Sequence, residues 1–184
     1  MDLICPKCGS TRIVHMDYGG SFSSGEMDSQ KPAYKCKACK QEFGTVCGSS
    51  HYSNIVQSIT ISILKPYENK DSISLKLSKN ENGIKYRIDI QDCGAIVKGN
   101  ISEMTWKNIC NALFNEIFLD SWKNRVYNPK IIDGTIWDVE VKFEKKHALQ
   151  IHGCNGYSPY WNELIALVGP ILDANGIDSS KYKV

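Results

Sequence analysis

Two pairs of closely spaced cysteines constrain the fold of this chain more than any other feature of its sequence. Both pairs have the form Cys-x-x-Cys, with Cys5 and Cys8 in the first and Cys36 and Cys39 in the second. Four thiolates in two such pairs supply the whole tetrahedral shell of a structural zinc ion. A catalytic zinc keeps one position open for water, so four cysteine ligands predict a structural zinc and no reaction at the metal.

Other common roles of paired cysteines agree less well with the sequence. A disulfide framework is typical of secreted chains, but no apolar stretch follows Met1 and Cys5 comes almost at once. We therefore expect a cytoplasmic protein with reduced cysteines. A thioredoxin-like redox motif uses a single Cys-x-x-Cys in a βαβ unit, whereas here the motif occurs twice.

The spacing between the pairs leaves a second ligand set open. Between Cys8 and Cys36 lie 27 residues, more than the roughly 15–20 of the common pattern. The alternative ligands are Cys36, Cys39, Cys47 and His51. In that arrangement Cys5 and Cys8 stay free or are joined by His15. The doubled pair is the preferred set because it already closes the shell with four thiolates.

The residues around the cysteines predict a hairpin. Residues 11–16 and 33–35 can pair as strands, while the glycine- and serine-rich stretch 19–25 is expected to form a mobile tip. Phe43 is expected to cover the metal site, and Gly44 to turn the chain.

The two cysteine knuckles, Cys5-Pro6-Lys7-Cys8-Gly9-Ser10 and Cys36-Lys37-Ala38-Cys39, resemble the zinc-ribbon family. Zinc ribbons occur in transcription factors, in transposases and as N-terminal modules of bacterial proteins. The resemblance covers residues 1–47 and implies a fold rather than a task. So short a unit buries too little apolar surface to fold unaided, and metal binding supplies about 10–16 kcal/mol in small zinc modules.

A second domain is expected over residues 55–184, which are enough to bury a hydrophobic core. Lys and Arg total 22 against 20 Asp and Glu, and the charge is near +1 on either side of residue 50. Dedicated nucleic-acid binders usually show a clear basic excess, so this balance counts against that class. No run approaches the roughly 18 apolar residues of a membrane span, and no membrane partner is expected.

The hydrophobic pattern predicts an α+β fold with a mainly antiparallel sheet and two principal helices on one face. Strands are expected over 59–64, 73–78, 84–91, 137–144 and 148–152, with a hairpin turn at 80–83. The first helix is expected to carry the apolar residues that recur between Trp106 and Phe118, with Asn100 or Ser102 as its N-cap, and a polar connection follows from 120 to 133. The second is expected to start at Ser158-Pro159 and to be interrupted at Gly169-Pro170.

The C-terminal half also carries a resemblance. Residues 133–141 and 151–161 are similar to a hairpin-plus-helix signature, written roughly DGTxWxLxIxF and GxNxYPxxW, of bacterial proteins without an established activity. Ser158, between Tyr157 and Pro159, departs from that form. The resemblance implies a folding unit and little chemistry.

Three functions from different classes remain open, and a small-molecule substrate is not inferred. The leading one is a binding module that contacts a protein or a nucleic acid. A second is a weak nucleic-acid binder that uses Lys31, Lys35, Lys37 and Lys40, with Tyr34 and Phe22 to stack on bases. The third is a thiol-dependent enzyme with Cys154, His152 and either Asp133 or Asp138. The usual nucleophile motifs are missing, so an enzyme is the less favoured class. The loop 153–156 could also bind an anion.

Overall fold

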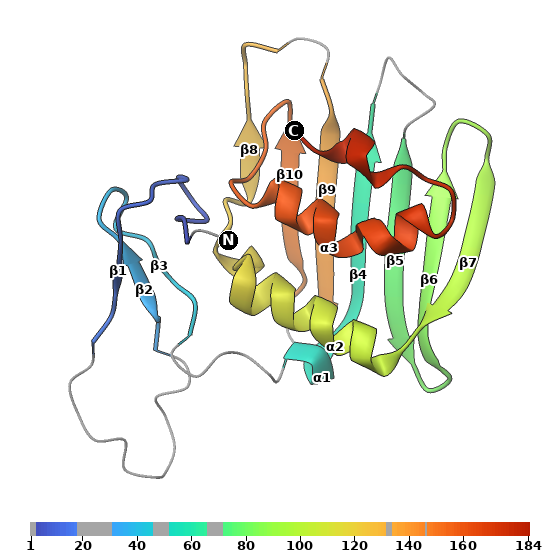
Figure 1. Cartoon of the computed structure of the whole chain (residues 1–184), viewed down its shortest axis with the longest axis horizontal. Coiled ribbons are helices and arrows are strands. Elements are labelled where there is room, and N and C mark those ends of the chain that lie inside the picture. The colour runs from blue at the N-terminus through green and yellow to red at the C-terminus, as the bar shows by residue number, and fades with distance from the viewer. Residues whose placement is uncertain (1–2, 18–30, 46–51, 66–71, 132–133, 146) are drawn as a thin grey trace.

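The computed structural model describes residues 3–17, 31–45, 52–65, 72–131, 134–145 and 147–184 (Figure 1). In this part of the chain a small antiparallel sheet of three strands accompanies a larger mixed sheet of seven strands and several helices. The predicted α+β class is confirmed. The stretch 19–25, expected to be a mobile tip, lies outside the described residues, as do Phe22, Cys47, His51 and Asp133.

The small sheet has the order β1-β2-β3 and contains the predicted hairpin. Its strands are β1 (Ile13–His15), β2 (Tyr34–Cys36) and β3 (Glu42–Phe43). β1 and β2 pair antiparallel, with Ile13 opposite Cys36. β3 was not predicted, because two residues are too few to show an alternating pattern.

The large sheet has the order β7-β6-β5-β4-β9-β10-β8, with β4 at its centre. Its strands are β4 (Val56–Leu64), β5 (Ile73–Asn80), β6 (Gly83–Ile90), β7 (Ala95–Ile101), β8 (Arg125–Tyr127), β9 (Ile136–Phe143) and β10 (Leu149–Cys154). The five predicted strands are confirmed, and Gly83 takes a positive φ of 107° in the predicted turn. All neighbours pair antiparallel except β8, which runs parallel to β10. The two edge strands, β7 and β8, were not predicted.

The first predicted helix begins at Glu103, directly after the predicted cap Ser102, and continues from α-helix into a π-helical turn that ends at Glu116. The described helices are α1 (Tyr52–Ile55), α2 (Glu103–Asn111), a π-helical turn (Ala112–Glu116), a 3-10 turn (Leu119–Ser121), α3 (Trp161–Asp173) and a last 3-10 turn (Ser179–Tyr182). Ser102 is the N-cap of α2, and its hydroxyl accepts a hydrogen bond from the N–H of Thr105 at 3.0 Å. None of the described helices is both long and apolar enough to cross a membrane.

The second predicted helix differs at both of the positions named for it. α3 begins at Trp161 with Tyr160 as N-cap, so Ser158 does not cap it. The expected interruption at Gly169-Pro170 is wrong, because the helix continues to Asp173. Pro170 lies on the exposed side of α3, where a carbonyl left without a partner can be hydrated. Gly169 is buried, and a Cβ there would meet the Ser179 hydroxyl at 2.8 Å.

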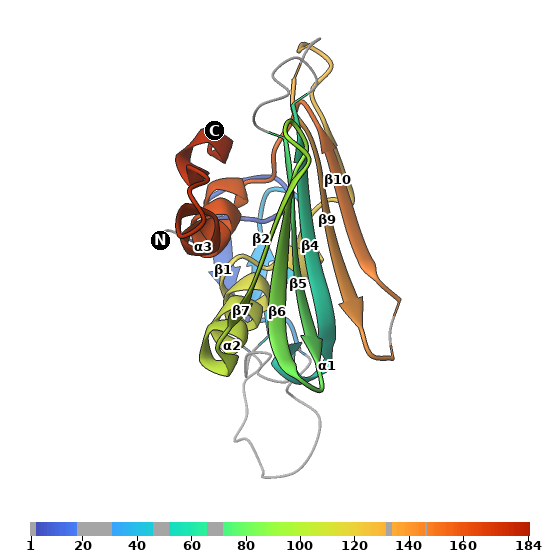
Figure 2. The same ribbon diagram turned by 90° about the vertical axis from the view of Figure 1, so that its right-hand side faces the viewer.

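Within the described part of the chain, helices and the small sheet cover one face of the large sheet and leave the other face uncovered. Figure 2 shows α2, α3 and the small sheet on the same side of the large sheet. Ile59, Ile61 and Ile63 of β4 point to this side and are at most 2% exposed, in a core that includes Trp106 of α2 and Leu164 of α3. The alternate residues of each strand point to the other side, which we call the open face.

Candidate metal centre

The four cysteines of the two predicted pairs lie close together. The Sγ atoms of Cys5 and Cys39 are 3.6 Å apart, those of Cys8 and Cys36 are 3.7 Å apart, and all four lie within 4.8 Å of one another. A tetrahedral metal with sulfur ligands at about 2.3 Å has sulfur–sulfur edges of about 3.8 Å. The cluster could therefore hold a metal ion. Among the described residues it is the one group of three or more His, Cys, Asp or Glu side chains so placed.

Local backbone hydrogen bonds shape each knuckle in the same way. In the first, the N–H of Gly9 donates to the carbonyl of Cys5 at 2.8 Å, and the N–H of Cys5 donates to the carbonyl of Ser10 at 2.9 Å. The second knuckle repeats both bonds, at 2.9 and 2.8 Å, with the residues four and five positions after Cys36. Two different sequences thus form the same turn, and together the two turns surround the four sulfur atoms.

The surroundings of the sulfur atoms favour one thiolate in advance of metal binding. Backbone N–H groups of Cys39 and Ala38 lower the pKa of Cys36 to about 6, because they donate to its sulfur. Burial raises the pKa of the Cys5 thiol to about 12. An incoming metal ion therefore meets one ionised ligand at neutral pH and must displace the proton of Cys5.

Each knuckle also needs a left-handed residue after its second cysteine. Gly9 has φ 71° in the first knuckle, and Lys40 has φ 64° in the second. A side chain at this φ costs about 1 kcal/mol, which glycine avoids. We therefore expect Lys40→Gly to raise the free energy of unfolding of the metal-loaded protein by up to about 1 kcal/mol, measured by urea denaturation.

Gly9→Ala is the matched opposite change, because its Cβ would meet only Pro159 at an ordinary 3.7 Å. It should lower the free energy of unfolding by about 1 kcal/mol through φ alone. A loss of stability in Lys40→Gly would show that the Lys40 side chain contributes more than its strain costs.

An aromatic cluster joins the small sheet to the large domain. Phe43 of β3 is 2% exposed and belongs to the main hydrophobic core. Its ring lies 5.5 Å from that of Tyr34 and 5.1 Å from that of Phe118, which follows the π-helical turn with a left-handed φ of 51°. Phe43, expected over the metal, therefore packs between the small sheet and the helical segment that contains Phe118.

A hydrogen-bonded contact lies beside the first cysteine knuckle. The Tyr160 hydroxyl accepts from the N–H of Ile4 at 3.0 Å and donates to the carbonyl of Ile4 at 2.9 Å. Tyr160 directly precedes α3, and Ile4 directly precedes Cys5. Sequence reasoning assigned no role to Tyr160, because no local pattern relates residues 156 positions apart.

The structure agrees only in part with the hypothesis that the lysines around the second knuckle bind nucleic acid with Tyr34 as a stacking ring. Lys35 forms an ion pair with Glu42 at 2.7 Å. The Tyr34 ring packs against His15, Phe43 and Phe118, so it is not presented as a free stacking surface.

The structure joins two of the residues named for a thiol-dependent enzyme. His152 and Asp138 lie opposite each other on β10 and β9, with His152 Nδ1 2.8 Å from Asp138 Oδ1. Cys154 is on the same strand, and among the described residues it forms no hydrogen bond with His152. A nucleophile activated by a neighbouring base is therefore not formed in this structure.

The C-terminal signature residues mainly pack against one another. The rings of Trp137 and Trp161 are 4.6 Å apart, and Trp137 Nε1 donates to the carbonyl of Gly156 at 2.8 Å. In the loop that was considered for an anion, the N–H of Asn155 already donates to the carbonyl of Thr135 at 2.9 Å. These contacts favour a packing role for the signature.

No family model, no curated protein and no solved structure matches this chain. The geometry of the site is therefore the basis for assigning a function.

Proposed function

We propose that this chain is a zinc-stabilised binding protein. In this proposal Cys5, Cys8, Cys36 and Cys39 hold one structural zinc ion, and the zinc ribbon they form is fastened to an α+β domain that offers the binding surface. The observation that carries the proposal is the convergence of the four sulfur atoms within 4.8 Å.

The chemistry of the ligands supports zinc. Thiolates are soft ligands, and a tetrahedral set of four sulfur atoms is typical of zinc or of iron–sulfur sites. Zinc with four cysteines has no open position for water or substrate, so its contribution is folding free energy. A binding role for the whole chain follows more directly from such a site than an enzymatic one.

The metal site predicts a defined stoichiometry. Reduced protein supplied with metal should contain about one zinc per chain, measured by elemental analysis, and should lack the visible absorption of an iron–sulfur centre. Cys36→Ser should bind zinc far more weakly, because it removes one of the four sulfur ligands.

Cys93→Ser is the matched control, since Cys93 is exposed and lies outside the cluster. It should retain zinc with unchanged affinity in competition with a chromophoric chelator. A stoichiometry near zero in the original protein, or full retention by Cys36→Ser, would contradict the proposal.

A further inference from the structure

Positively charged side chains stand side by side on the open face of the large sheet. Lys76 of β5 lies opposite Arg87 of β6, which lies opposite Lys98 of β7. Lys85 is two residues from Arg87 on the same strand and so points to the same face. Neighbouring strands are about 4.8 Å apart, so the row of three spans about 10 Å. We call these four residues the basic row.

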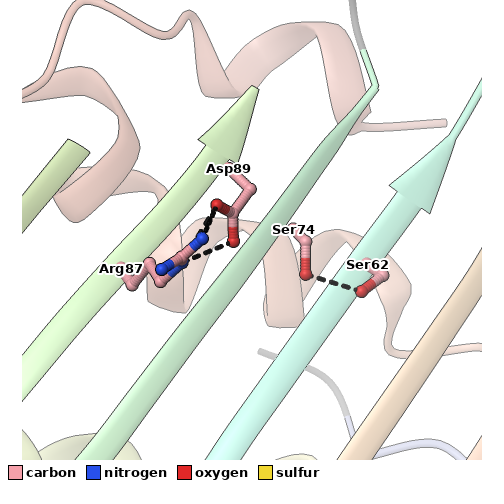
Figure 3. Close-up of polar contacts among 4 residues, drawn as sticks. All are labelled: Ser62, Ser74, Arg87 and Asp89. Atoms are coloured by element: carbon pink, nitrogen blue, oxygen red, sulfur yellow. Dashed lines mark hydrogen bonds and ion pairs between the residues drawn. The ribbon is translucent and has the colours of Figure 1, made fainter. Parts of the chain in front are cut away.

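The basic row carries a repulsion between like charges that the fold offsets only in part. Like charges directly opposite each other on adjacent strands are destabilising. Arg87 is compensated by Asp89 at 2.7 Å, as Figure 3 shows. Lys76, Lys85 and Lys98 are exposed, and among the described residues none of them forms an ion pair. Lys98 and Lys76 act on Asp89 and Glu140 only at longer range than an ion pair, so all three lysines can still contact a partner.

The open face as a whole has an excess of positive charge. Its basic strand residues are Lys76, Lys85, Arg87, Lys98, Arg125 and Lys142. Its acidic strand residues are Asp89, Asp138 and Glu140. The net charge of the whole chain is only +2. Positive charge is therefore concentrated on the open face of a chain that is near neutral as a whole, and a polyanion is the partner that this face complements.

The remaining side chains of the open face help to decide which kind of partner binds there. Protein interfaces depend on apolar or aromatic anchors near their centre. Here the largely exposed apolar residues on the strands are at the margins: Leu64 at a strand end, and Ile96 and Tyr127 on the edge strands. A second copy of the chain would bring two positive faces together. An ordinary protein interface and a second copy of this chain are therefore both disfavoured as partners of the open face.

Serine hydroxyl groups lie beside the basic row on the open face. Ser62 and Ser74 lie on the open face of β4 and β5, 2.9 Å apart between their Oγ atoms (Figure 3). Serine hydroxyls and lysines are common donors to phosphate oxygens. The only aromatic residue of β4–β7 is Tyr86, and its hydroxyl bonds to Asn175 on the covered side, so these strands offer no ring for stacking on bases.

We propose that the open face over β4–β7 binds the phosphate backbone of double-stranded nucleic acid without reading its sequence. The proposal rests on the proposed binding function and names its partner. Contact is made by the basic row and the neighbouring hydroxyls, and it depends strongly on salt, because each phosphate neutralised by a lysine releases counterions.

The test measures binding of the full, zinc-loaded chain to a fluorescently labelled mixed-sequence DNA duplex across a range of salt concentrations. The triple variant Lys76→Gln, Lys85→Gln, Lys98→Gln should bind about tenfold or more weakly at low salt. Its slope of log affinity against log salt should be less steep by about 0.9 for each phosphate that the variant no longer neutralises. Two unrelated duplex sequences should behave alike.

The matched control is Lys35→Gln, Lys37→Gln, Lys40→Gln, which removes the same charge from the second knuckle. It should bind as the original protein does. Equal weakening in both variants would show an effect of net charge and overturn the proposal, as would weakening in the knuckle variant alone.

Three further results would also overturn the proposal that the open face binds duplex nucleic acid. These are no binding at low salt, tighter binding to a single strand than to the duplex, and competition by polyglutamate as effective as that by unlabelled duplex. The last result would identify an acidic protein as the partner. Zinc content and circular dichroism of every variant keep a failure of the metal site distinct from a failure of the nucleic-acid surface.

Discussion

Removal of the metal is expected to unfold the small sheet and to lower the melting temperature of the α+β domain while leaving its transition cooperative. The small sheet has three short strands, so we expect it to need folding free energy from the proposed metal ion. Apart from Phe43, every buried residue of the main core lies between Val56 and Tyr182, so the large sheet and its helices should persist. Without the folded small sheet, however, Phe118 no longer packs against Phe43, and Tyr160 no longer bonds to Ile4.

The size of this shift follows from those two interactions. Burial of Phe43 contributes about 2–3 kcal/mol, and the two hydrogen bonds of Tyr160 contribute about 1 kcal/mol each. At about 2–4 °C per kcal/mol for a chain of this length, the melting temperature should fall by about 8–20 °C. Calorimetry with and without chelator measures it, and circular dichroism should show the large sheet retained.

Tyr160→Phe provides a control in the presence of zinc. It removes the hydroxyl that bonds to Ile4, so it should reproduce part of the shift while zinc stays bound. An unchanged melting temperature in chelator would show that the interface contributes no stability. Loss of every cooperative transition would contradict the division into folding units at 1–47 and 55–184, which stays a prediction.

Gly153→Ala is expected to destabilise the protein by about 3 kcal/mol or more, because an added methyl group has no space. A Cβ at Gly153 would lie 1.9 Å from Cε2 of Trp137. The Trp137 ring is fully buried, packs on Trp161 and is held by its hydrogen bond to Gly156. It therefore cannot move aside without losing these contacts. Urea denaturation measures the loss of stability.

Two variants separate this clash from other effects of replacing glycine. Gly94→Ala has nothing within 4 Å of its Cβ and a φ of 64°, so it should cost about 1 kcal/mol. In Gly153→Ala combined with Trp137→Phe, the smaller ring leaves room for the methyl group. The combined cost should fall below the sum of the two single costs. Additive costs would refute the clash as the cause.

The parts of this protein that sequence alone determined are those with a local physical cause. The four cysteines were found because the Cys-x-x-Cys spacing is itself local: each pair lies in one turn, which hydrogen bonds close within six residues. The five central strands were found because burial of one sheet face requires every second residue to be apolar. Ser102 was identified as a possible cap because its hydroxyl bonds to an N–H three residues away.

Tertiary structure alone decided the features that depend on distant residues. The edge strands β7 and β8 have one neighbour each, and no fully buried side chain imposes an alternating pattern on them. α3 continues through Pro170 because that residue is on the exposed side. Phe43 joins the core through Phe118. The basic row exists only because strand register places Lys76, Arg87 and Lys98 side by side, and register is set by pairing across the whole sheet.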